Sequence, residues 1–304
     1  MSGAARGDAT TVAVLGIGRM GGALAGRLAA CGLDVVLYNR SPEPARALAA
    51  SIGARVAATP AEAVAGSAVA ISMVSDDAAV HDLFEGPTGA LAGLDSRTVA
   101  VDMSTVLPGT IQGLEAAVRA TGAGILDAPV SGSVAFAAAG GLTIMVGGSP
   151  ADVERARPVL DKLGQRVIHL GPLGAGATMK LAVNTVIYGL NQSLSEALVL
   201  AERAGLDRAT AYDVIRSSAA GAPFVEYKRA AFIEPDSTPT AFALALAEKD
   251  LGLILELAAA VGTEMPQAKT NLELVRRAGS GDPGRDIASI AAYLRDSRSV
   301  GGSE

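Results

Sequence analysis

The stretch TTVAVLGIGRMG, residues 10–21, decides the fold class. Its first half is an aliphatic, β-branched run of the kind that forms a buried strand. Glycines follow at Gly16, Gly18 and Gly21, and the amphipathic segment GGALAGRLAACG continues to Gly32. A strand, a G-x-G-x-x-G turn and a helix in this order predict the first βα unit of a dinucleotide-binding domain.

The glycine spacing suits the approach of a pyrophosphate to the backbone. Gly16 makes the turn, Gly18 admits the phosphates, and Gly21 lets helix and strand pack together. The following helix directs its first N–H groups and positive dipole end at the phosphates. An ordinary glycine-rich turn shares the spacing but not the strand–turn–helix context. We therefore assign this loop to the cofactor: Gly16, Ile17, Gly18, Arg19, Met20 and Gly21.

Further strand and helix patterns alternate up to about residue 170. Apolar runs occur at DVVLYNR, AVAISMV, RTVAVDMS, GILDAPV, LTIMVGG and RVIHLG, with helical patterns such as PEPARALAASIG between them. This alternation predicts an α/β Rossmann domain with a mostly parallel, doubly wound sheet. From about residue 172 the strand signals stop, and residues 177–205 form the pattern of one long helix. Helical patterns also cover residues 207–218, 239–262, 267–279 and 286–297.

These patterns divide the chain into four parts. We expect a disordered lead-in at residues 1–10 and an NADP-binding Rossmann domain at residues 11–171. An all-α domain for substrate binding and oligomerisation follows at residues 172–296, joined to the first by a long interdomain helix. Residues 297–304 are expected to be a flexible tail.

Composition excludes several function classes. The chain has 304 residues, a net charge of −6 and no basic stripe, which argues against nucleic acid. No apolar run approaches the ~18 residues of a membrane helix. The N-terminus lacks the apolar core of a signal peptide, and the single Cys31 excludes an internal disulfide and a multi-cysteine metal site. We expect a cytoplasmic protein without a bound metal.

The end of the second predicted strand indicates the choice of nicotinamide cofactor. An NAD-selective site normally places Asp or Glu here to bind the ribose hydroxyls. This chain has Asn39, Arg40 and Ser41 instead. A guanidinium pairs with a 2′-phosphate through charge-assisted bonds, so these residues favour NADP over NAD. A solvated surface arginine is the alternative.

Hydride transfer to or from a carbonyl needs a proton carrier. His81 and His169 are the only histidines, and neither lies in a recognisable catalytic pattern. Lys180 lies in an apolar helical stretch, with Asn184 four residues later on the same predicted face. Desolvation lowers the pKa of an amine toward neutrality, which suits proton transfer. From the helix period alone, a snorkelling or paired lysine explains the position equally well.

Two other stretches carry polar groups in apolar surroundings. DAPVSGS, residues 127–133, ends a strand on residues whose N–H groups and Ser131 hydroxyl can hold a carboxylate. AEKDL, residues 247–251, places Lys249 and Asp250 in a long apolar helix, where a solvated charged face is the alternative.

Together with the glycine loop, these segments resemble a known family. GIGRMG, VDMST with Pro108, DAPVSGS with GGLTIMVGG, GPLGAGATMKLAVN and FALALAEKDL occur in the family's order. The chain thereby resembles the β-hydroxyacid dehydrogenases over roughly residues 11–295. Members include 3-hydroxyisobutyrate dehydrogenase, tartronate semialdehyde reductase and glyoxylate/succinic semialdehyde reductase.

The resemblance implies hydride transfer between NADP(H) and a small β-hydroxyacid or its semialdehyde, with Lys180 as the acid/base. It also implies homodimers or homotetramers joined through the helical domain. Thr105 is implied to contact the cofactor, and Lys249 and Asp250 to close the site. The residues assigned to the substrate are Ser131, Gly132, Ser133, Asn184 and Asp250. Those assigned to the cofactor beyond the glycine loop and residues 39–41 are Met73, Val74, Ser75, Thr105 and Lys249.

Two departures from the family pattern fall at the implied substrate pocket. Ser133 stands where many members have glycine, and the segment VAFAAAGG places Phe136 in a region that is usually richer in glycine. A hydroxymethyl and a phenyl group would narrow or dry the pocket, which puts the usual small hydroxyacids in question. The alternatives are an imine or enamine reductase, whose family usually lacks the lysine and DAPVSG, and a non-catalytic NADP-binding module.

Overall fold

The computed structural model describes residues 10–296 and separates the chain into two compact units. The division falls between Lys180 and Leu181, inside the long helix α8 (Ala175–Arg203). We call the part before it the nucleotide-binding unit and the part after it the helical unit. The expected lead-in, apart from Thr10, and the expected tail at residues 297–304 lie outside the described residues.

The nucleotide-binding unit is built on one sheet with the strand order β3-β2-β1-β4-β5-β6-β8-β7, and β9 pairs with β8. The first six strands are β1 (Thr11–Leu15), β2 (Asp34–Tyr38), β3 (Arg55–Val56), β4 (Val69–Ser72), β5 (Val99–Asp102) and β6 (Gly124–Asp127). All six are parallel. The last three are β7 (Val130–Ser131), β8 (Leu142–Gly148) and β9 (Gly164–Gly171). Strand β8 runs antiparallel to β6 and β7 and parallel to β9. Because most neighbouring strands are parallel, the predicted mostly parallel sheet is confirmed.

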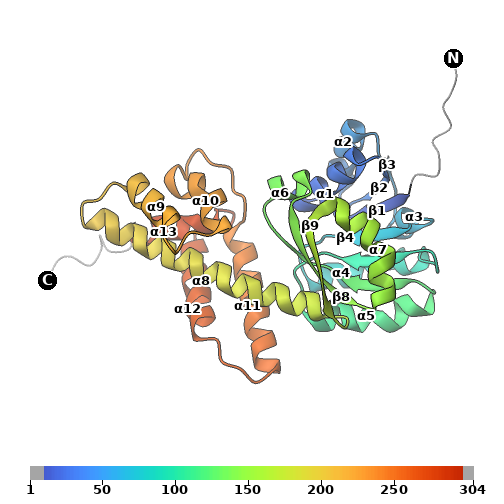
Figure 1. The fold of residues 1–304 in the computed structure, drawn as a ribbon. Coiled ribbons are helices and arrows are strands. Elements are labelled where there is room, and N and C mark those ends of the chain that lie inside the picture. Colours follow the sequence, from blue (N-terminus) through green and yellow to red (C-terminus); the bar gives the residue numbers. More distant parts are fainter. Residues whose placement is uncertain (1–9, 297–304) are drawn as a thin grey trace, which may run out of the picture. The chain divides into compact units, whose positions relative to one another are not determined.

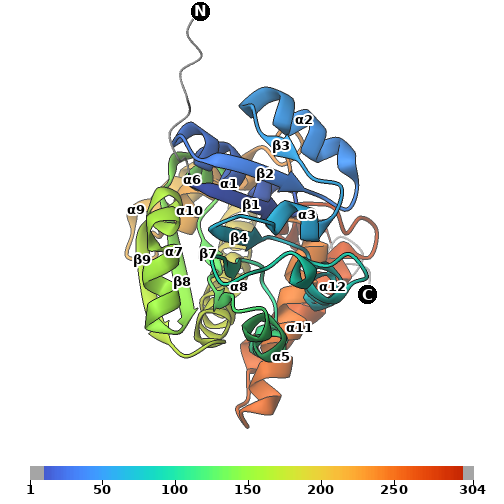
Figure 2. The same ribbon diagram turned by 90° about the vertical axis from the view of Figure 1, so that its right-hand side faces the viewer.

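Helices cover both faces of this sheet (Figure 2). One face packs against α1 (Arg19–Ala30), α2 (Pro42–Ile52), α6 (Val134–Ala139) and α7 (Pro150–Leu163). The other packs against α3 (Pro60–Val64), α4 (Asp77–Glu85), the 3₁₀ turn η1 (Ala90–Ala92) and α5 (Pro108–Ala120). Val12 and Val14 enter the first core, whereas Ala13 and Leu15 enter the second. Burial on both faces explains why these strands are continuous apolar runs rather than alternating ones.

The strand order reverses between β1 and β4. Strands β2 and β3 continue from β1 in one direction, and β5 and β6 continue from β4 in the other. Parallel α/β sheets bind ligands outside the carboxyl ends of their strands at such a reversal. The segments that follow β1, β2, β4, β5 and β6 therefore define where a site is expected.

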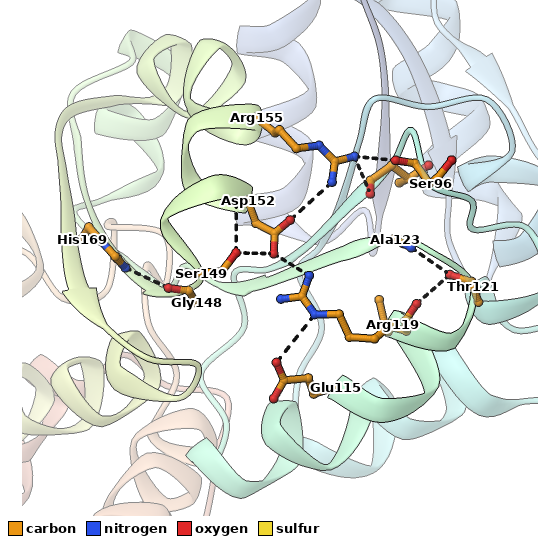
Figure 3. Close-up of polar contacts among 12 residues, drawn as sticks. Ser96, Glu115, Arg119, Thr121, Ala123, Gly148, Ser149, Asp152, Arg155 and His169 are labelled. Atoms are coloured by element: carbon orange, nitrogen blue, oxygen red, sulfur yellow. Dashed lines mark hydrogen bonds and ion pairs between the residues drawn. The ribbon is translucent and has the colours of Figure 1, made fainter.

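An ion cluster around the buried Asp152 attaches α7 to the sheet. The Asp152 carboxylate is 2.7 Å from Arg119 of α5 and 3.3 Å from Arg155 of α7. Figure 3 shows the two guanidinium groups on either side of it, with Arg155 continuing to the Ser96 carbonyl at 2.9 Å. Asp152 thus connects α7 to α5 through Arg119, and Arg155 connects α7 to the loop before β5. The cluster therefore has a structural role.

The helical unit contains the rest of α8 and the helices that follow it (Figure 1). These are α9 (Arg208–Ser217), α10 (Pro223–Ile233), α11 (Leu244–Ala260), α12 (Pro266–Gly279), the 3₁₀ turn η2 (Ile287–Ser289) and α13 (Ile290–Asp296). Its described β contact is one isolated bridge between Ala243 and Asp286. None of the helices within residues 10–296 is long and apolar enough to pass through a membrane.

Two details of the helical unit differ from the expectation. Helix α10 was not anticipated from the sequence, and α11 begins at Leu244 rather than near Pro239. The cause of the late start is Asp286, whose carboxylate accepts from the backbone N–H groups of Ala241 and Phe242. The buried Lys228 of α10 pairs with the same carboxylate at 2.6 Å. These contacts engage the N–H groups of Ala241 and Phe242 outside the helix, and α11 begins only at Leu244.

Candidate active site

The glycine loop after β1 has the shape that a pyrophosphate needs. A Cβ on Gly16 would lie 2.3 Å from the Met73 carbonyl oxygen, and one on Gly21 would lie 2.0 Å from the Gly16 carbonyl oxygen. The protein itself therefore requires glycine at these two positions. A Cβ on Gly18 would meet no protein atom within 4 Å. Gly18 lies at the N-cap of α1 and makes no side-chain cap, so its backbone stays open to a ligand.

The other loop residues have different environments. Ile17 is buried and Met20 is partly buried against the core, whereas Arg19 is exposed at the first position of α1. An exposed first turn with free N–H groups is a ready anion site, and the Arg19 charge adds to it. The local geometry therefore fits the phosphates of a dinucleotide.

The three polar residues after β2 have different environments. The Asn39 side chain accepts from the Ile17 N–H at 2.8 Å and donates to the Ser41 carbonyl at 2.8 Å. Asn39 thus ties the glycine loop to the start of α2. Arg40 and Ser41 are exposed. Within residues 10–296 the Arg40 guanidinium makes no hydrogen bond or ion pair, so it remains available to an anion at this edge.

The segments after β4 and β5 lie over a buried acidic network. Asp102, at the end of β5, accepts from Ser72 Oγ at 2.5 Å and from the Ser104 N–H and hydroxyl, both at 3.0 Å. Ser104 in turn accepts from the Val74 N–H at 3.0 Å. Burial raises the pKa of Asp102 to about 6, although the serine hydrogen bonds oppose the shift.

The residues assigned to the cofactor in these segments are placed accordingly. Met73 and Val74 are partly buried beside the glycine loop, since a Cβ on Gly16 would touch both. Ser75 is exposed, and its hydroxyl donates to Asp76 at 2.7 Å. Thr105 is partly buried in the loop between β5 and α5. These residues therefore belong to loops at the carboxyl ends of β4 and β5.

The DAPVSGS segment crosses from β6 to β7 and on to α6. Ser131 ends β7 and is partly buried, and Gly132 has a φ of +138°, which favours glycine. Ser133 is the N-cap of α6, with its hydroxyl accepting from the Phe136 N–H at 3.4 Å. The Phe136 side chain is 44% exposed. Ser133 therefore has a helix-capping role in addition to the pocket role considered from the sequence.

Lys180 is held against the same segment. Its Nζ donates to the backbone carbonyl of Val130 at 2.8 Å, directly before Ser131 in the chain. The Asp127 carboxylate accepts from the N–H groups of Gly174 and Ala177 at 2.8 and 2.7 Å. Burial raises the pKa of Asp127, and the backbone N–H donors oppose this. Because Lys180 Nζ bonds to Val130, the lysine side chain points at the segment that carries Ser131 rather than snorkelling to solvent.

A second polar cluster lies in the helical unit. Asn184 Nδ2 and the Tyr188 hydroxyl donate to Asp250 Oδ2 at 2.8 and 2.7 Å, and Lys249 Nζ lies 2.9 Å from Asp250 Oδ1. Asp250 is 2% exposed, so the solvated-face alternative does not hold for it. Burial raises the pKa of Tyr188 well above its usual value, and the Asp250 charge adds to the effect.

Both histidines have structural contacts. His81 Nδ1 lies 2.7 Å from Glu85 on the exposed side of α4. His169 Nε2 lies 2.9 Å from the Gly148 carbonyl, as Figure 3 shows, and 3.0 Å from the Gly171 carbonyl. A ring nitrogen between two carbonyl oxygens carries a proton and donates it to them.

Two family models match almost the whole chain. Residues 11–171 match the NAD binding domain of 6-phosphogluconate dehydrogenase. Residues 174–294 match the model described as NAD-binding of NADP-dependent 3-hydroxyisobutyrate dehydrogenase.

Individual proteins agree with these models. The chain is 33% identical to glyoxylate/succinic semialdehyde reductase 2, chloroplastic, of Arabidopsis thaliana, over 95% of this chain and 80% of that protein. It is 34% identical to 3-hydroxyisobutyrate dehydrogenase of Pseudomonas aeruginosa, over 94% of this chain and 99% of that one. The solved Mycobacterium tuberculosis 3-hydroxyisobutyrate dehydrogenase with L-serine has a TM-score of 0.82 and 31% identity, covering 94% of this chain and 99% of that one.

The chain belongs to the β-hydroxyacid dehydrogenase family. The predicted Rossmann fold followed by a helical domain is thereby confirmed, as is the prediction of an enzyme. As a member of this family, the protein is a nicotinamide-dependent oxidoreductase that acts on hydroxyl groups. The open backbone at Gly18 and the bare N-terminus of α1 fit such a cofactor.

Three polar residues of this β-hydroxyacid dehydrogenase were not predicted from the sequence as members of these clusters. They are Asp102 and Asp127 in the nucleotide-binding unit and Tyr188 in the helical unit. An acidic residue that directly ends a buried strand is a usable signal, because its charge must be compensated there. Tyr188 carries no such signal, since its partner Asp250 lies 62 positions away in the chain.

Proposed function

We propose that the protein is an NADP-dependent oxidoreductase that interconverts a small β-hydroxyacid and its semialdehyde, with Lys180 as the acid/base. The observation that carries this proposal is the 2.8 Å bond from Lys180 Nζ to the Val130 carbonyl. It fixes an amine beside Ser131, the residue that the family resemblance assigns to the substrate.

The chemistry divides between the cofactor and the chain. A bound nicotinamide supplies or accepts the hydride. During reduction the Lys180 ammonium gives one proton to the substrate carbonyl oxygen, and during oxidation the neutral amine removes it from the hydroxyl. Arginine could not take this role because it stays protonated in proteins. Ser131 and Gly132 would orient the substrate carboxylate through a hydroxyl and a backbone N–H.

Arg40 supports NADP rather than NAD. Its guanidinium is exposed after β2, the position from which dinucleotide sites approach the ribose 2′ group. Asn39 contributes to cofactor binding indirectly, because its side chain bonds to the Ile17 N–H and the Ser41 carbonyl. The chain has no carboxylate at residues 39–41 that would repel a 2′-phosphate.

A substrate screen tests the proposal. NADPH oxidation is followed with glyoxylate, succinic semialdehyde, methylmalonate semialdehyde, tartronate semialdehyde and a cyclic imine. We expect the highest kcat/KM with one of the semialdehydes or glyoxylate. Preference for the imine would favour the imine reductase alternative, and NADPH binding without any turnover would favour a non-catalytic module.

We also propose that the protein forms a homodimer or homotetramer through its helical unit. Val186 and Leu200 of α8 are 69% and 72% exposed, and Val214 of α9 is 65% exposed. The first two lie on one side of α8, because their spacing is a multiple of seven. Light scattering should give a multiple of the chain mass, and Leu200→Glu should reduce it. A monomeric mass for the unaltered protein would contradict this proposal.

A further inference from the structure

The start of α8 is held by a carboxylate from a distant strand. The first N–H groups of a helix have no partner within the helix and need an acceptor elsewhere. Helices often satisfy them with a local Ser, Thr or Asp. Helix α8 instead uses Asp127 of β6, whose two oxygens accept from Gly174 and Ala177 at 2.8 and 2.7 Å.

Glycines make the room for this contact. A Cβ on Gly147 would lie 2.3 Å from Asp127 Oδ1. A Cβ on Gly176 would lie 2.9 Å from Asp127 Oδ2 and 2.3 Å from the Met145 carbonyl oxygen. The carboxylate, 1% exposed, therefore fits a slot between β8 and the first turn of α8. Neither the slot nor the helix start can shift without breaking these contacts.

The same short segment also holds the lysine. Asp127 bonds to Ala177 and Val130 bonds to Lys180, so the second pair lies three residues further along both segments than the first. One segment from β6 to β7 thus grips α8 at its start and again about one helical turn later. The Asp127 contact sets where the helix begins, and the Val130 carbonyl accepts a hydrogen bond from the Lys180 amine.

We propose that Asp127 is a positioning residue that sets the place of Lys180 by anchoring the N-terminus of α8. The inference rests on the proposed role of Lys180 as the acid/base. Asp127 itself does not act on the substrate. Its two oxygens are occupied by backbone N–H groups, and its effect passes through the helix.

The decisive variant is Asp127→Asn, which keeps the size of the side chain but replaces one acceptor oxygen with a donor. One of the two backbone N–H groups then faces an NH₂ group. We expect kcat with the best substrate of the screen to fall about 10–100-fold, as for a catalytic group displaced by about 1 Å. NADPH affinity, measured by fluorescence, should stay within about threefold because the glycine loop is unchanged.

A double-mutant cycle separates positioning from a general structural effect. Residues that act through one another give non-additive effects. In a Lys180→Met background, Asp127→Asn should therefore cause little further loss in the single-turnover rate. A full additional loss would show that Asp127 acts by another route, which overturns the inference.

A matched control removes a helix cap elsewhere. Asp207 caps α9 by accepting from the Thr210 N–H at 2.8 Å. Asp207→Ala should lower the melting temperature without changing kcat. If Asp127→Asn does not fold, Asp127→Ser tests the same contact, because its shorter side chain cannot reach both N–H groups. It should give the same non-additive loss with Lys180→Met.

The outcomes for the two proposals are distinct. If Lys180→Met retains most of the wild-type kcat, the acid/base role fails, and a loss with Asp127→Asn would then overturn the inference too. If Lys180→Met is impaired but Asp127→Asn is not, only the positioning role is wrong. A parallel loss of NADPH affinity with Asp127→Asn would equally contradict it.

Discussion

The polar residues assigned to the candidate site are held in different ways in the two units. In the nucleotide-binding unit, backbone N–H groups bond Asn39, Asp102 and Asp127. In the helical unit, the partners of Asp250 are the side chains of Asn184 and Tyr188, with Lys249 beside them. The predicted site residues of the first unit thus have main-chain donors, whereas the Asp250 cluster consists of side-chain contacts.

This difference predicts how each unit responds to substitution. Backbone donors stay in place when a neighbouring side chain changes, so a change in the first unit should remove one function and leave the others. In a side-chain cluster every member orients the next, and losing one leaves buried polar groups unsatisfied. Substitutions in the Asp250 cluster should therefore lower stability and, through the substrate contact that the family resemblance implies for Asn184, substrate affinity.

The largest effect is expected from Lys180→Met, in the nucleotide-binding unit. The substitution keeps the aliphatic stem and removes the proton carrier, so kcat should fall by ~10²–10⁴-fold. Lys180→Arg should give a similar loss because its guanidinium does not deprotonate. NADPH affinity should be unchanged, and the exposed Lys269→Met serves as the control. A variant that keeps more than about a tenth of kcat would contradict a contribution of this size.

Arg40→Ala should have the next largest effect, confined to one cofactor. A charge-assisted hydrogen bond contributes ~1.5–3 kcal/mol, so NADPH should bind about tenfold to hundredfold more weakly. NADH affinity should change little. Arg97, paired with Asp95 before β5, provides the control variant Arg97→Ala. Equal losses for NADPH and NADH in a fluorescence titration would show that Arg40 does not recognise the 2′-phosphate.

The same contrast explains what could be predicted from the sequence. The glycine loop, the strands and Lys180 lie in local patterns, because each depends on neighbours a few residues away. Helix α10 and the late start of α11 depend on Lys228 and Asp286, which are 58 positions apart. The Asp250 cluster joins residues more than sixty positions apart. Such pairs leave no periodic trace, so only the folded structure reveals them.

Tyr188→Phe examines the side-chain cluster. The ring stays packed against Phe242, with the ring centroids 6.3 Å apart in the parent, but Asp250 loses one donor. We expect about 1.5 kcal/mol less stability and a higher KM, because Asp250, which holds the Asn184 amide, loses one of its own donors. Tyr212→Phe is the control, since it removes a buried bond to the Val225 carbonyl elsewhere in the unit. Equal KM values for the two variants would contradict a role of the Asp250 cluster in substrate binding.

The smallest effect is expected at Asp102 and concerns pH. Burial raises its pKa in the folded state from 3.8 to about 6, so the folded protein binds this proton more tightly than the unfolded chain. Stability from this group is therefore gained as pH falls from 7 toward 5, the reverse of a carboxylate with a lowered pKa. The lowered pKa values of Asp207, Asp213 and Asp286 act at more acidic pH. Relative to Asp102→Asn, the wild type should gain about 1 kcal/mol of unfolding free energy between pH 7 and 5. Urea denaturation at both pH values measures the difference, and parallel pH dependences would show that Asp102 is not a buried, titrating carboxylate.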